Sequence, residues 1–181
     1  MKVGRMIITL IGMPGAGKSS AGKKLAAMLG YKFIDTDKLV IDDSGKGLQN
    51  IVNDLGDMAL VRAEEQSILG LDLKDNCIIA TGGSVVYSEK AMQFLKTRSF
   101  IVYLDVPFAI ITRRLSNLAT RGVVGLKEKG LRGLYNERTI LYRSFADHII
   151  EVGRKDKVRD VVKKIMENVL AEYDVEWTNN Q

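Results

Sequence analysis

The chain has 181 residues and a formal net charge of +5, from 27 lysines and arginines against 22 acidic residues. This length predicts a single domain over residues 1–181, which can bury roughly 70% of its unfolded surface and needs no disulfide to fold. One cysteine and one histidine exclude an internal disulfide and a zinc site built from several such ligands. No stretch approaches the ~20 apolar residues of a membrane span and no signal peptide is recognisable, so we expect a cytoplasmic protein without a membrane partner.

The positive net charge favours anionic partners. The basic residues are spread along the chain, and the aromatic residues, 7% of the total, do not alternate with them as they do in RNA-binding segments. Small anions, such as nucleotides, phosphorylated metabolites or carboxylic acids, therefore fit better than nucleic acid does. We expect the protein to be a monomer.

Short apolar runs alternate along the chain with longer stretches of helical periodicity. In chain order, the first half predicts a strand at Met6–Ile11, a helix at Lys18–Leu29, a strand at Tyr31–Ile34, helices through most of Asp37–Leu69 with breaks at Ser44–Gly47 and Gly56, and a strand at Cys77–Ala80. Cys77 is expected to be a small buried residue of that strand rather than a nucleophile.

The second half predicts a helix around Met92–Lys96, a strand at Phe100–Leu104, a helix with Pro107 in its first turn and running toward Leu115, a helix at Leu134–Phe145, a strand at His148–Val152 and a closing helix at Lys157–Tyr173. Residues 117–133, which are rich in glycine and charge, are expected to be flexible, and the polar residues from Asp174 to form a frayed tail. Five strands separated by helices predict an α/β protein with a mostly parallel sheet, helices on both faces and ligands at the carboxyl ends of the strands.

A phosphate-binding loop follows the first predicted strand. Residues 12–19 match the pattern G-x-x-x-x-G-K-[ST] at every fixed position, between a strand and a helix, which disfavours the alternative of a glycine-rich turn without a ligand. The loop's N–H groups and the start of the helix attract phosphate; Lys18 can bridge the β- and γ-phosphates, and the Ser19 hydroxyl can ligate Mg²⁺. The candidate nucleotide-binding residues of this loop are Gly12, Met13, Pro14, Gly15, Ala16, Gly17, Lys18, Ser19 and Ser20.

Two carboxylates, Asp35 and Asp37, follow the second predicted strand in the sequence FIDTD. In a kinase, one could hold Mg²⁺ through water while the other accepts a hydrogen bond from the hydroxyl group that is phosphorylated. Helix capping explains the same residues equally well.

The chain resembles the shikimate kinases, small P-loop kinases related to the nucleoside-monophosphate kinases. The segments GMPGAGKSS, FIDTD, IIATGGS, RRLSNLATRG and ERTILYRSFAD carry the resemblance, in the family's order, over roughly residues 6–152. The resemblance implies a three-layer P-loop kinase fold, with a five-stranded sheet and a mobile lid at about residues 117–133. It also implies Mg²⁺ as cofactor and ATP and a small anionic hydroxy acid as substrates.

On the nucleotide side, the resemblance implies that Asp35 assists Mg²⁺ and that Arg121, in the lid, reaches the transferring phosphate. Arg114 and Arg154 would lie beside the adenine, although a solvent-exposed charge is the alternative for both. On the acceptor side, the resemblance implies that Asp37 orients the hydroxyl group.

Three further residues belong to the acceptor side by resemblance. Gly82 and Gly83 would offer backbone N–H groups to the acceptor, with a plain turn as the alternative. Arg138 would bind the acceptor carboxylate, and a solvent-exposed ion pair is its alternative.

The sequence departs from the family pattern on the acceptor side. Ser84 takes the third place of the family's glycine triplet, and Gly122 follows Arg121 where the family usually has proline. The family's F-R-x-x-E segment, whose arginine binds the shikimate carboxylate, falls on Leu60-Val61 when counted without a gap. A shift by one residue instead places Arg62 in the arginine position, and the sequence leaves both registers open.

We therefore expect an ATP-dependent kinase that phosphorylates a hydroxyl group of a carboxylate-bearing acceptor, with shikimate as the leading candidate and shikimate 3-phosphate as the product. Lys18, Asp37 and Arg121 are the expected catalytic residues. The alternatives are a related kinase acting on a gluconate-like sugar acid or a nucleoside monophosphate, and a nucleotide-dependent regulator without catalytic activity.

Overall fold

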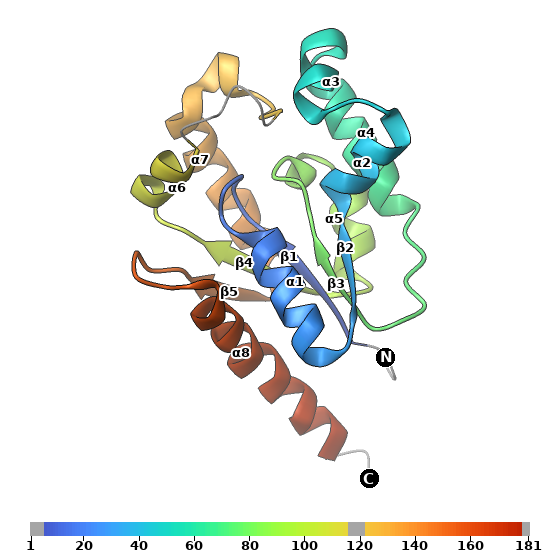
Figure 1. Cartoon of the computed structure of the whole chain (residues 1–181), viewed down its shortest axis with the longest axis vertical. Coiled ribbons are helices and arrows are strands. Elements are labelled where there is room, and N and C mark those ends of the chain that lie inside the picture. Colours follow the sequence, from blue (N-terminus) through green and yellow to red (C-terminus); the bar gives the residue numbers. More distant parts are fainter. Residues whose placement is uncertain (1–5, 116–121, 179–181) are drawn as a thin grey trace.

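The computed structural model describes residues 6–115 and 122–178, with the side chains of these residues as far as Val169. Its sheet has the strand order β2-β3-β1-β4-β5, and every pair of neighbouring strands is parallel (Figure 1). The strands are β1 (Ile7–Ile11), β2 (Lys32–Asp35), β3 (Cys77–Ala80), β4 (Phe100–Asp105) and β5 (His148–Glu151). The expected α/β fold with a parallel sheet is confirmed.

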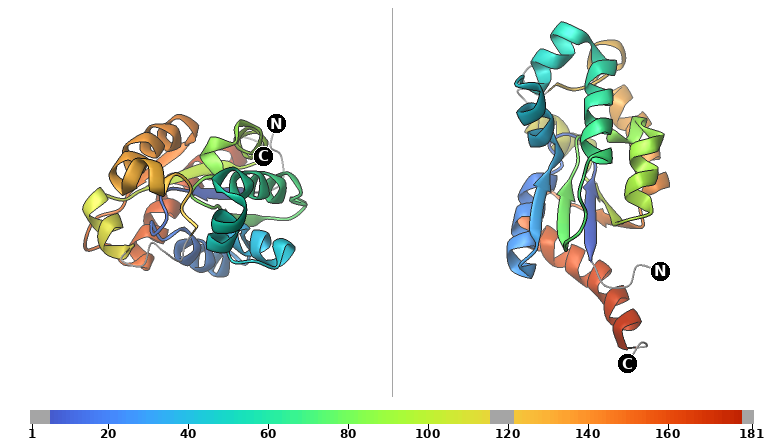
Figure 2. Two further views of the ribbon diagram at one scale, coloured as in Figure 1. Left: turned by 90° about the horizontal axis from the view of Figure 1, so that it is seen from above. Right: turned by 90° about the vertical axis from the view of Figure 1, so that its right-hand side faces the viewer.

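Helices lie on both faces of the sheet (Figure 2). Helices α1 and α8 pack together on one face, and α5 and α7 contact the sheet from the other. Helices α2, α3 and α4 lie beyond the carboxyl ends of the strands, across from the start of α7 (Figure 1). The helical elements are α1 (Lys18–Leu29), α2 (Thr36–Ser44), α3 (Leu48–Leu55), α4 (Asp57–Leu69), the 3-10 turn η1 (Val85–Tyr87), α5 (Glu89–Lys96), α6 (Phe108–Arg114), α7 (Leu126–Phe145) and α8 (Val158–Thr178).

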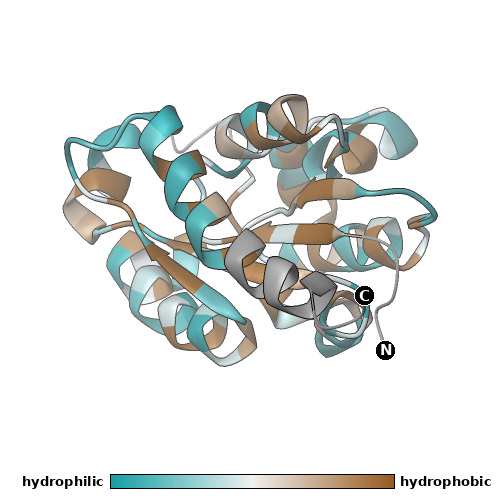
Figure 3. Ribbon diagram, turned by 90° about the horizontal axis from the view of Figure 1, so that it is seen from below, coloured by the Kyte–Doolittle hydropathy of each residue, from teal (hydrophilic) through white to brown (hydrophobic). Residues whose placement is uncertain are grey.

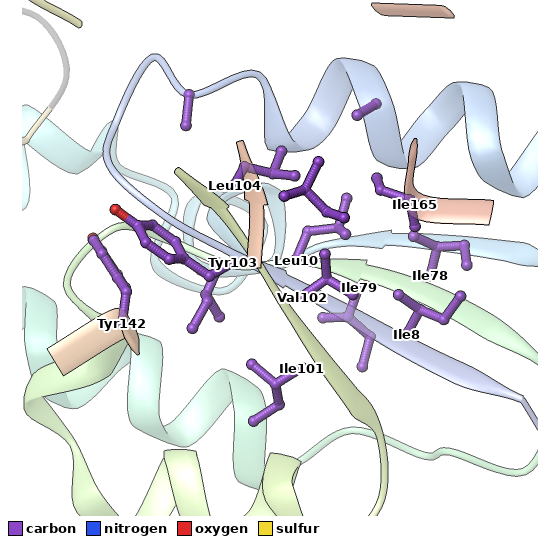
Figure 4. Packing of buried hydrophobic residues seen from close by; sticks show 14 of the residues in the cluster. Ile8, Leu10, Ile78, Ile79, Ile101, Val102, Tyr103, Leu104, Tyr142 and Ile165 are labelled. Atoms are coloured by element: carbon purple, nitrogen blue, oxygen red, sulfur yellow. The ribbon is translucent and has the colours of Figure 1, made fainter. Parts of the chain in front are cut away.

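The core lies on the two faces of the central strands. Every residue of β1 and β3 is buried, because helices cover both faces of a parallel sheet, and this explains why these strands are continuously apolar in sequence. Figure 4 shows strand residues from β1, β3 and β4 packed with Tyr142 of α7 and Ile165 of α8. Colouring by hydropathy shows mostly hydrophobic strands, and helices that carry both hydrophobic and hydrophilic residues (Figure 3). Cys77, the first residue of β3, is only 2% exposed.

Most expected boundaries agree with the structure to within a residue or two. Helix α1 and strand β3 have the expected ends, and the helical region after β2 is interrupted at the expected places, near Ser44–Gly47 and at Gly56. Pro107 is the residue that precedes α6 rather than part of its first turn, so that expectation was wrong by one position.

Two expectations about irregular segments were wrong. Residues 126–133 of the expected flexible segment form the start of α7, with a kink at Gly130, whose φ of 62° and ψ of 168° are not helical. Glycine tolerates this conformation, so a glycine-rich segment can bend without losing the helix on either side. Helix α8 continues to Thr178, because residues 158–178 contain no glycine or proline to end it. No helix in the part of the chain that the structure describes is long and apolar enough to cross a membrane.

Candidate active site

A cavity of about 930 Å³ opens at the carboxyl edge of the sheet. The loop after β1 lines one side, and residues from α2, α4, the segment after β3 and α7 line the other. This is the position at which parallel α/β sheets bind ligands, because loops from neighbouring strands diverge there. Residues 14–20 of the predicted phosphate-binding loop all line the cavity.

The loop after β1 has the backbone conformation that its glycines allow. Gly12, Gly15 and Gly17 have φ values of 145°, 78° and 98°, which side-chain-bearing residues rarely adopt. A methyl group added at Gly12 would also lie 2.9 Å from the carbonyl oxygen of Leu104, which explains why the loop must approach β4 without a side chain. Helix α1 begins at Lys18, so its N-terminal end with its partial positive charge faces the cavity.

Lys18 is buried beneath this loop. Its Nζ donates hydrogen bonds to the carbonyl oxygens of Gly12 at 2.7 Å and Met13 at 3.0 Å, which places these two residues behind the cavity wall. Burial lowers the pKa of Lys18 to about 8, and the nearby carboxylate of Asp37 opposes that shift. A phosphate group entering the cavity would therefore stabilise the charged ammonium.

Two carboxylates face Lys18 across the cavity. Asp37 lies in the first turn of α2, and Glu64 lies in α4 and is 3% exposed. Burial raises the pKa of Asp37, against the effect of Lys18, and the Oδ1 atom of Asp37 is buried without a hydrogen-bond partner among the described residues. Such an orphaned acceptor suits a ligand hydroxyl that donates to it.

Glu64 has a different environment. Its Oε2 accepts a hydrogen bond of 2.7 Å from the Ser84 hydroxyl, and burial raises the pKa of Glu64 to about 7. A methyl group added at Gly82 would clash with the carboxylates of both Glu64 and Asp37, so glycine is required where the two acids converge. Glu64 was not among the site residues expected from the sequence. The available signal was a charged residue four positions from Leu60 and from Ile68, on the apolar stripe of a helix.

Arg138 of α7 lies at the same end of the cavity and is only 1% exposed. Its Nη2 donates to the carbonyl oxygen of Val124 at 2.8 Å, and its Nε donates to the Tyr87 hydroxyl at 3.2 Å. The alternative of a solvent-exposed ion pair is therefore wrong for Arg138. The structure brings Lys18, Asp37 and Arg138 to one cavity.

The two glycines after β3 have partly different surroundings. Gly83 lines the cavity, and its carbonyl oxygen accepts a hydrogen bond of 2.6 Å from the Tyr142 hydroxyl. The N–H group of Gly82 donates to Thr36 Oγ1 at 3.2 Å, within the protein. Gly82 therefore lets the carboxylates of Asp37 and Glu64 lie close to the backbone, and Gly83 is the glycine that borders the cavity.

Arg114 lies beside the phosphate-binding loop. Its Nη1 donates to the carbonyl oxygens of Gly15 at 3.2 Å and Ala16 at 3.4 Å, and the residue lines the cavity beside the phosphate-binding loop. Arg154 is exposed and is not a lining residue; Asp156 and Lys157 from the same segment line the cavity instead. Arg121 lies outside the described residues.

The structure shows which of Val61 and Arg62, both in helix α4, is buried. Val61 is 6% exposed and belongs to an apolar cluster with Leu60 and Val124, whereas Arg62 is exposed and does not line the cavity. Arg62 therefore does not take the inward position that the shifted register would give it, and the ungapped register agrees with the structure. Counted without a gap, Val61 takes the place of the family's arginine, and the described lining of the cavity has two arginines, Arg114 beside the phosphate-binding loop and Arg138 near the carboxylates.

The residues expected to bind Mg²⁺ lie in the first turn of α1 and at the carboxyl end of β2. Ser19 lines the cavity. Asp35 is the last residue of β2 and is half-buried, and its carboxylate is close enough to Lys18 to oppose the lowering of the Lys18 pKa. Within residues 6–115 and 122–178 no group of three or more histidine, cysteine or acidic side chains could hold a metal ion. A hydroxyl and a carboxylate fit a Mg²⁺ ion that arrives with nucleotide phosphates, because such an ion needs only one or two protein ligands.

The parallel sheet, the phosphate-binding loop with its buried lysine, and the carboxylates and arginine opposite define a P-loop phosphotransferase for small molecules. The shikimate kinase family model matches residues 14–171. Shikimate kinases from Caldanaerobacter subterraneus and Aromatoleum aromaticum are 33% and 32% identical over 168 and 165 residues, which cover 92% and 88% of this chain and 95% and 94% of those proteins.

Solved structures agree with this match. The shikimate kinase of Acinetobacter baumannii in complex with shikimate superposes with a TM-score of 0.85 at 30% identity, covering 93% of this chain and 94% of that one. The shikimate kinase of Aquifex aeolicus superposes with a TM-score of 0.79 at 28% identity, covering 93% and 98%. The chain belongs to the shikimate kinase family. The expectations of that family, of a P-loop kinase fold and of an ATP-dependent kinase are confirmed.

Proposed function

We propose that this protein transfers the γ-phosphoryl group of ATP to a hydroxyl group of shikimate, giving shikimate 3-phosphate. The observation that carries the proposal is the composition of one cavity. It combines a phosphate-binding loop and the buried Lys18 with the carboxylate of Asp37 and the guanidinium of Arg138. One end therefore suits polyphosphate, and the other suits a molecule that has both hydroxyl and carboxylate groups.

In this proposal, the nucleotide phosphates bind to the N–H groups of residues 14–20 and to the start of α1. Lys18 exchanges its hydrogen bonds with the Gly12 and Met13 carbonyls for the β- and γ-phosphates, and Arg114 borders the base. Ser19 directly and Asp35 through water would hold Mg²⁺, which supplies charge neutralisation of the phosphates when bound. Arg121 is assigned to the transferring phosphate from its place in the sequence.

The acceptor occupies the other end of the cavity. Its carboxylate binds to the guanidinium of Arg138, and the hydroxyl group that is to be phosphorylated donates a hydrogen bond to the orphaned Oδ1 of Asp37. Asp37 thereby fixes the attacking oxygen, and its raised pKa makes it a better acceptor for the hydroxyl proton. Positioning and charge neutralisation carry most of the rate, because phosphoryl transfer needs little covalent chemistry from the protein.

One observation favours a second candidate within the same reaction class. Val61 replaces one of the two arginines that the family places near the carboxylate, so the acceptor end has a smaller positive charge than the family pattern implies. A different hydroxy acid, such as a gluconate-like sugar acid, is therefore the alternative acceptor.

An ADP-release assay distinguishes these candidates. With Mg–ATP and each of shikimate, gluconate and a nucleoside monophosphate in turn, we expect ADP release that depends on shikimate. The Lys18→Ala variant should lose ATP affinity and ADP release, whereas Lys24→Ala, an exposed lysine of the same helix, should retain both. Release with gluconate alone would support the second candidate. ATP binding without release for any acceptor would contradict a kinase and favour a nucleotide-dependent regulator.

A further inference from the structure

The guanidinium of Arg138 is fixed from two directions inside the protein. Nη2 donates to the Val124 carbonyl, from the segment that precedes α7, and Nε donates to the Tyr87 hydroxyl of η1. The remaining nitrogen, Nη1, lies next to Gly83: a methyl group added there would be 3.1 Å from it. Gly83 lines the cavity, so these two bonds determine how the guanidinium is presented to a ligand.

We propose that Tyr87 is a positioning residue that orients Arg138 for binding the acceptor carboxylate. The inference rests on the function proposed above, in which Arg138 binds that group. A carboxylate that pairs with two guanidinium N–H groups requires the planar fork to have a defined direction, whereas a point charge would not. Arg114, the other described arginine that lines the cavity, is bonded to the phosphate-binding loop. Recognition of the carboxylate therefore depends on the orientation of Arg138.

The direction of the Tyr87 hydroxyl bond is itself determined. Tyr87 donates its proton to Glu137 Oε1 at 2.7 Å, and Glu137 Oε2 accepts from Lys129 Nζ at 2.6 Å. The hydrogen bond from Lys129, followed by that from Tyr87, lowers the pKa of Glu137, so this residue remains a carboxylate and an acceptor. The hydroxyl oxygen of Tyr87 therefore presents a lone pair to Arg138, whose Nε can only donate.

The ring of Tyr87 makes a second, separable contact. The guanidinium carbon of Arg138 lies 5.0 Å from the ring centroid, within the range of a cation–π interaction. Replacing Tyr87 with phenylalanine retains this contact and removes only the hydroxyl. The Tyr87→Phe variant thus tests orientation without removing the packing of the ring.

Steady-state kinetics of Tyr87→Phe should show a change in acceptor recognition alone. We expect the acceptor KM to rise about tenfold, the range expected for losing one hydrogen bond that involves a charged group. We expect the KM for ATP and kcat to stay within a factor of about two, because Tyr87 does not line the nucleotide end. Tyr31→Phe is the matched control, since the Tyr31 hydroxyl contacts Met6 Sδ at 3.8 Å, away from the cavity.

A double-mutant cycle decides whether Tyr87 acts through Arg138. If it does, Tyr87→Phe should change the acceptor KM less than about twofold in an Arg138→Ala background. An equal rise in both backgrounds, or no rise in the wild-type background, would overturn the inference. Glu137→Gln provides a second route: the KM should rise in the same direction by a smaller factor, and the effect should also vanish with Arg138→Ala. If Arg138→Ala leaves the acceptor KM unchanged, the carboxylate-binding role in the proposed function fails as well, whereas failure of Tyr87→Phe alone leaves it intact.

Discussion

The hydroxyl of Ser84 donates a hydrogen bond of 2.7 Å to Glu64 Oε2 at the acceptor end of the cavity, and both residues are 3% exposed. Ser84 stands at the third place of the family's glycine triplet, and Glu64 lies one helical turn after Val61, which stands at the place of the family's arginine. Ser84 therefore bonds a carboxylate of α4, the helix in which Val61 is the other departure. A buried carboxylate that has no arginine beside it in α4 is bonded instead to a neutral hydroxyl.

This environment predicts a stability that depends on pH. Burial raises the pKa of Glu64 from 4.5 to about 7, so the folded protein retains a proton that the unfolded chain has already lost. The free energy of unfolding should therefore fall as pH rises from about 4.5 to about 7 and should then level off with respect to this group. Glu64→Gln removes the effect, so its Tm relative to wild type should be higher at about pH 8 than at about pH 5.

Thermal unfolding monitored by circular dichroism at both pH values checks this difference. Glu89→Gln is the control, because Glu89 is an exposed carboxylate of α5. The same Tm difference for Glu64→Gln at both pH values would show that Glu64 does not titrate as its burial implies.

Lys18 should take up protons when ATP binds. Burial lowers its pKa to about 8, so about half of the molecules lack this proton at that pH, and bound phosphates should restore it. Calorimetric titrations in two buffers of different ionisation enthalpy should show an uptake of up to about half a proton at pH 8 and less at pH 7. Lys18→Arg should lose this uptake, because arginine does not titrate in this range. An unchanged uptake in Lys18→Arg would assign the proton to another group.

Arg138→Ala should raise the acceptor KM at least ~100-fold, because two charge-assisted hydrogen bonds to the carboxylate would be lost. Arg138→Lys should restore only part of the affinity, since an ammonium lacks the planar fork. The KM for ATP should change by less than about threefold. Arg62→Ala is the matched control: Arg62 is exposed on α4, and its replacement should leave both KM values unchanged. An effect of Arg62→Ala as large as that of Arg138→Ala would contradict the observed register of α4.

Gly82→Ala tests the convergence of the two carboxylates. The added methyl group would clash with both Asp37 and Glu64, so it should displace the oxygen that holds the acceptor hydroxyl. We expect kcat to fall at least ~10-fold while the KM for ATP remains within about twofold, since a small misplacement of reacting groups is costly. Gly153→Ala is a suitable control, because its added methyl group would meet Asp156 only at 3.6 Å or more. A variant with normal kcat would show that neither carboxylate needs its present position.

The sequence predicted the elements whose formation depends on residues close together in the chain. Strands such as β3 are short and continuously apolar, the phosphate-binding loop has glycines at fixed positions, and Gly56 ends one helix before the next. The sequence could not decide whether Val61 or Arg62 faces inward, because a one-residue shift rotates a helical side chain by ~100°. The choice depends on packing in the apolar cluster that Val61 joins, which includes residues of α2 and α3 and Val124.

The acceptor end was harder to predict for the same reason. Glu64, Ser84 and Tyr87 are ordinary polar residues in sequence, and their importance arises from contacts between segments 20 to 51 residues apart. The start of α7 was also missed, because its glycines and charges resemble a loop until the kink at Gly130 is seen.

The position of Cys77 has a practical consequence. The one thiol of the chain is 2% exposed, and its strand is paired with β1 on one side and β2 on the other. Burial raises the pKa of Cys77 to about 11, so the reactive thiolate is scarce while the sheet is intact. A thiol-specific chromophore should therefore label the protein only when β3 separates from its neighbours. The labelling rate then reports how often the central sheet opens. The factor by which nucleotide or acceptor lowers this rate measures ligand binding without an assay of turnover.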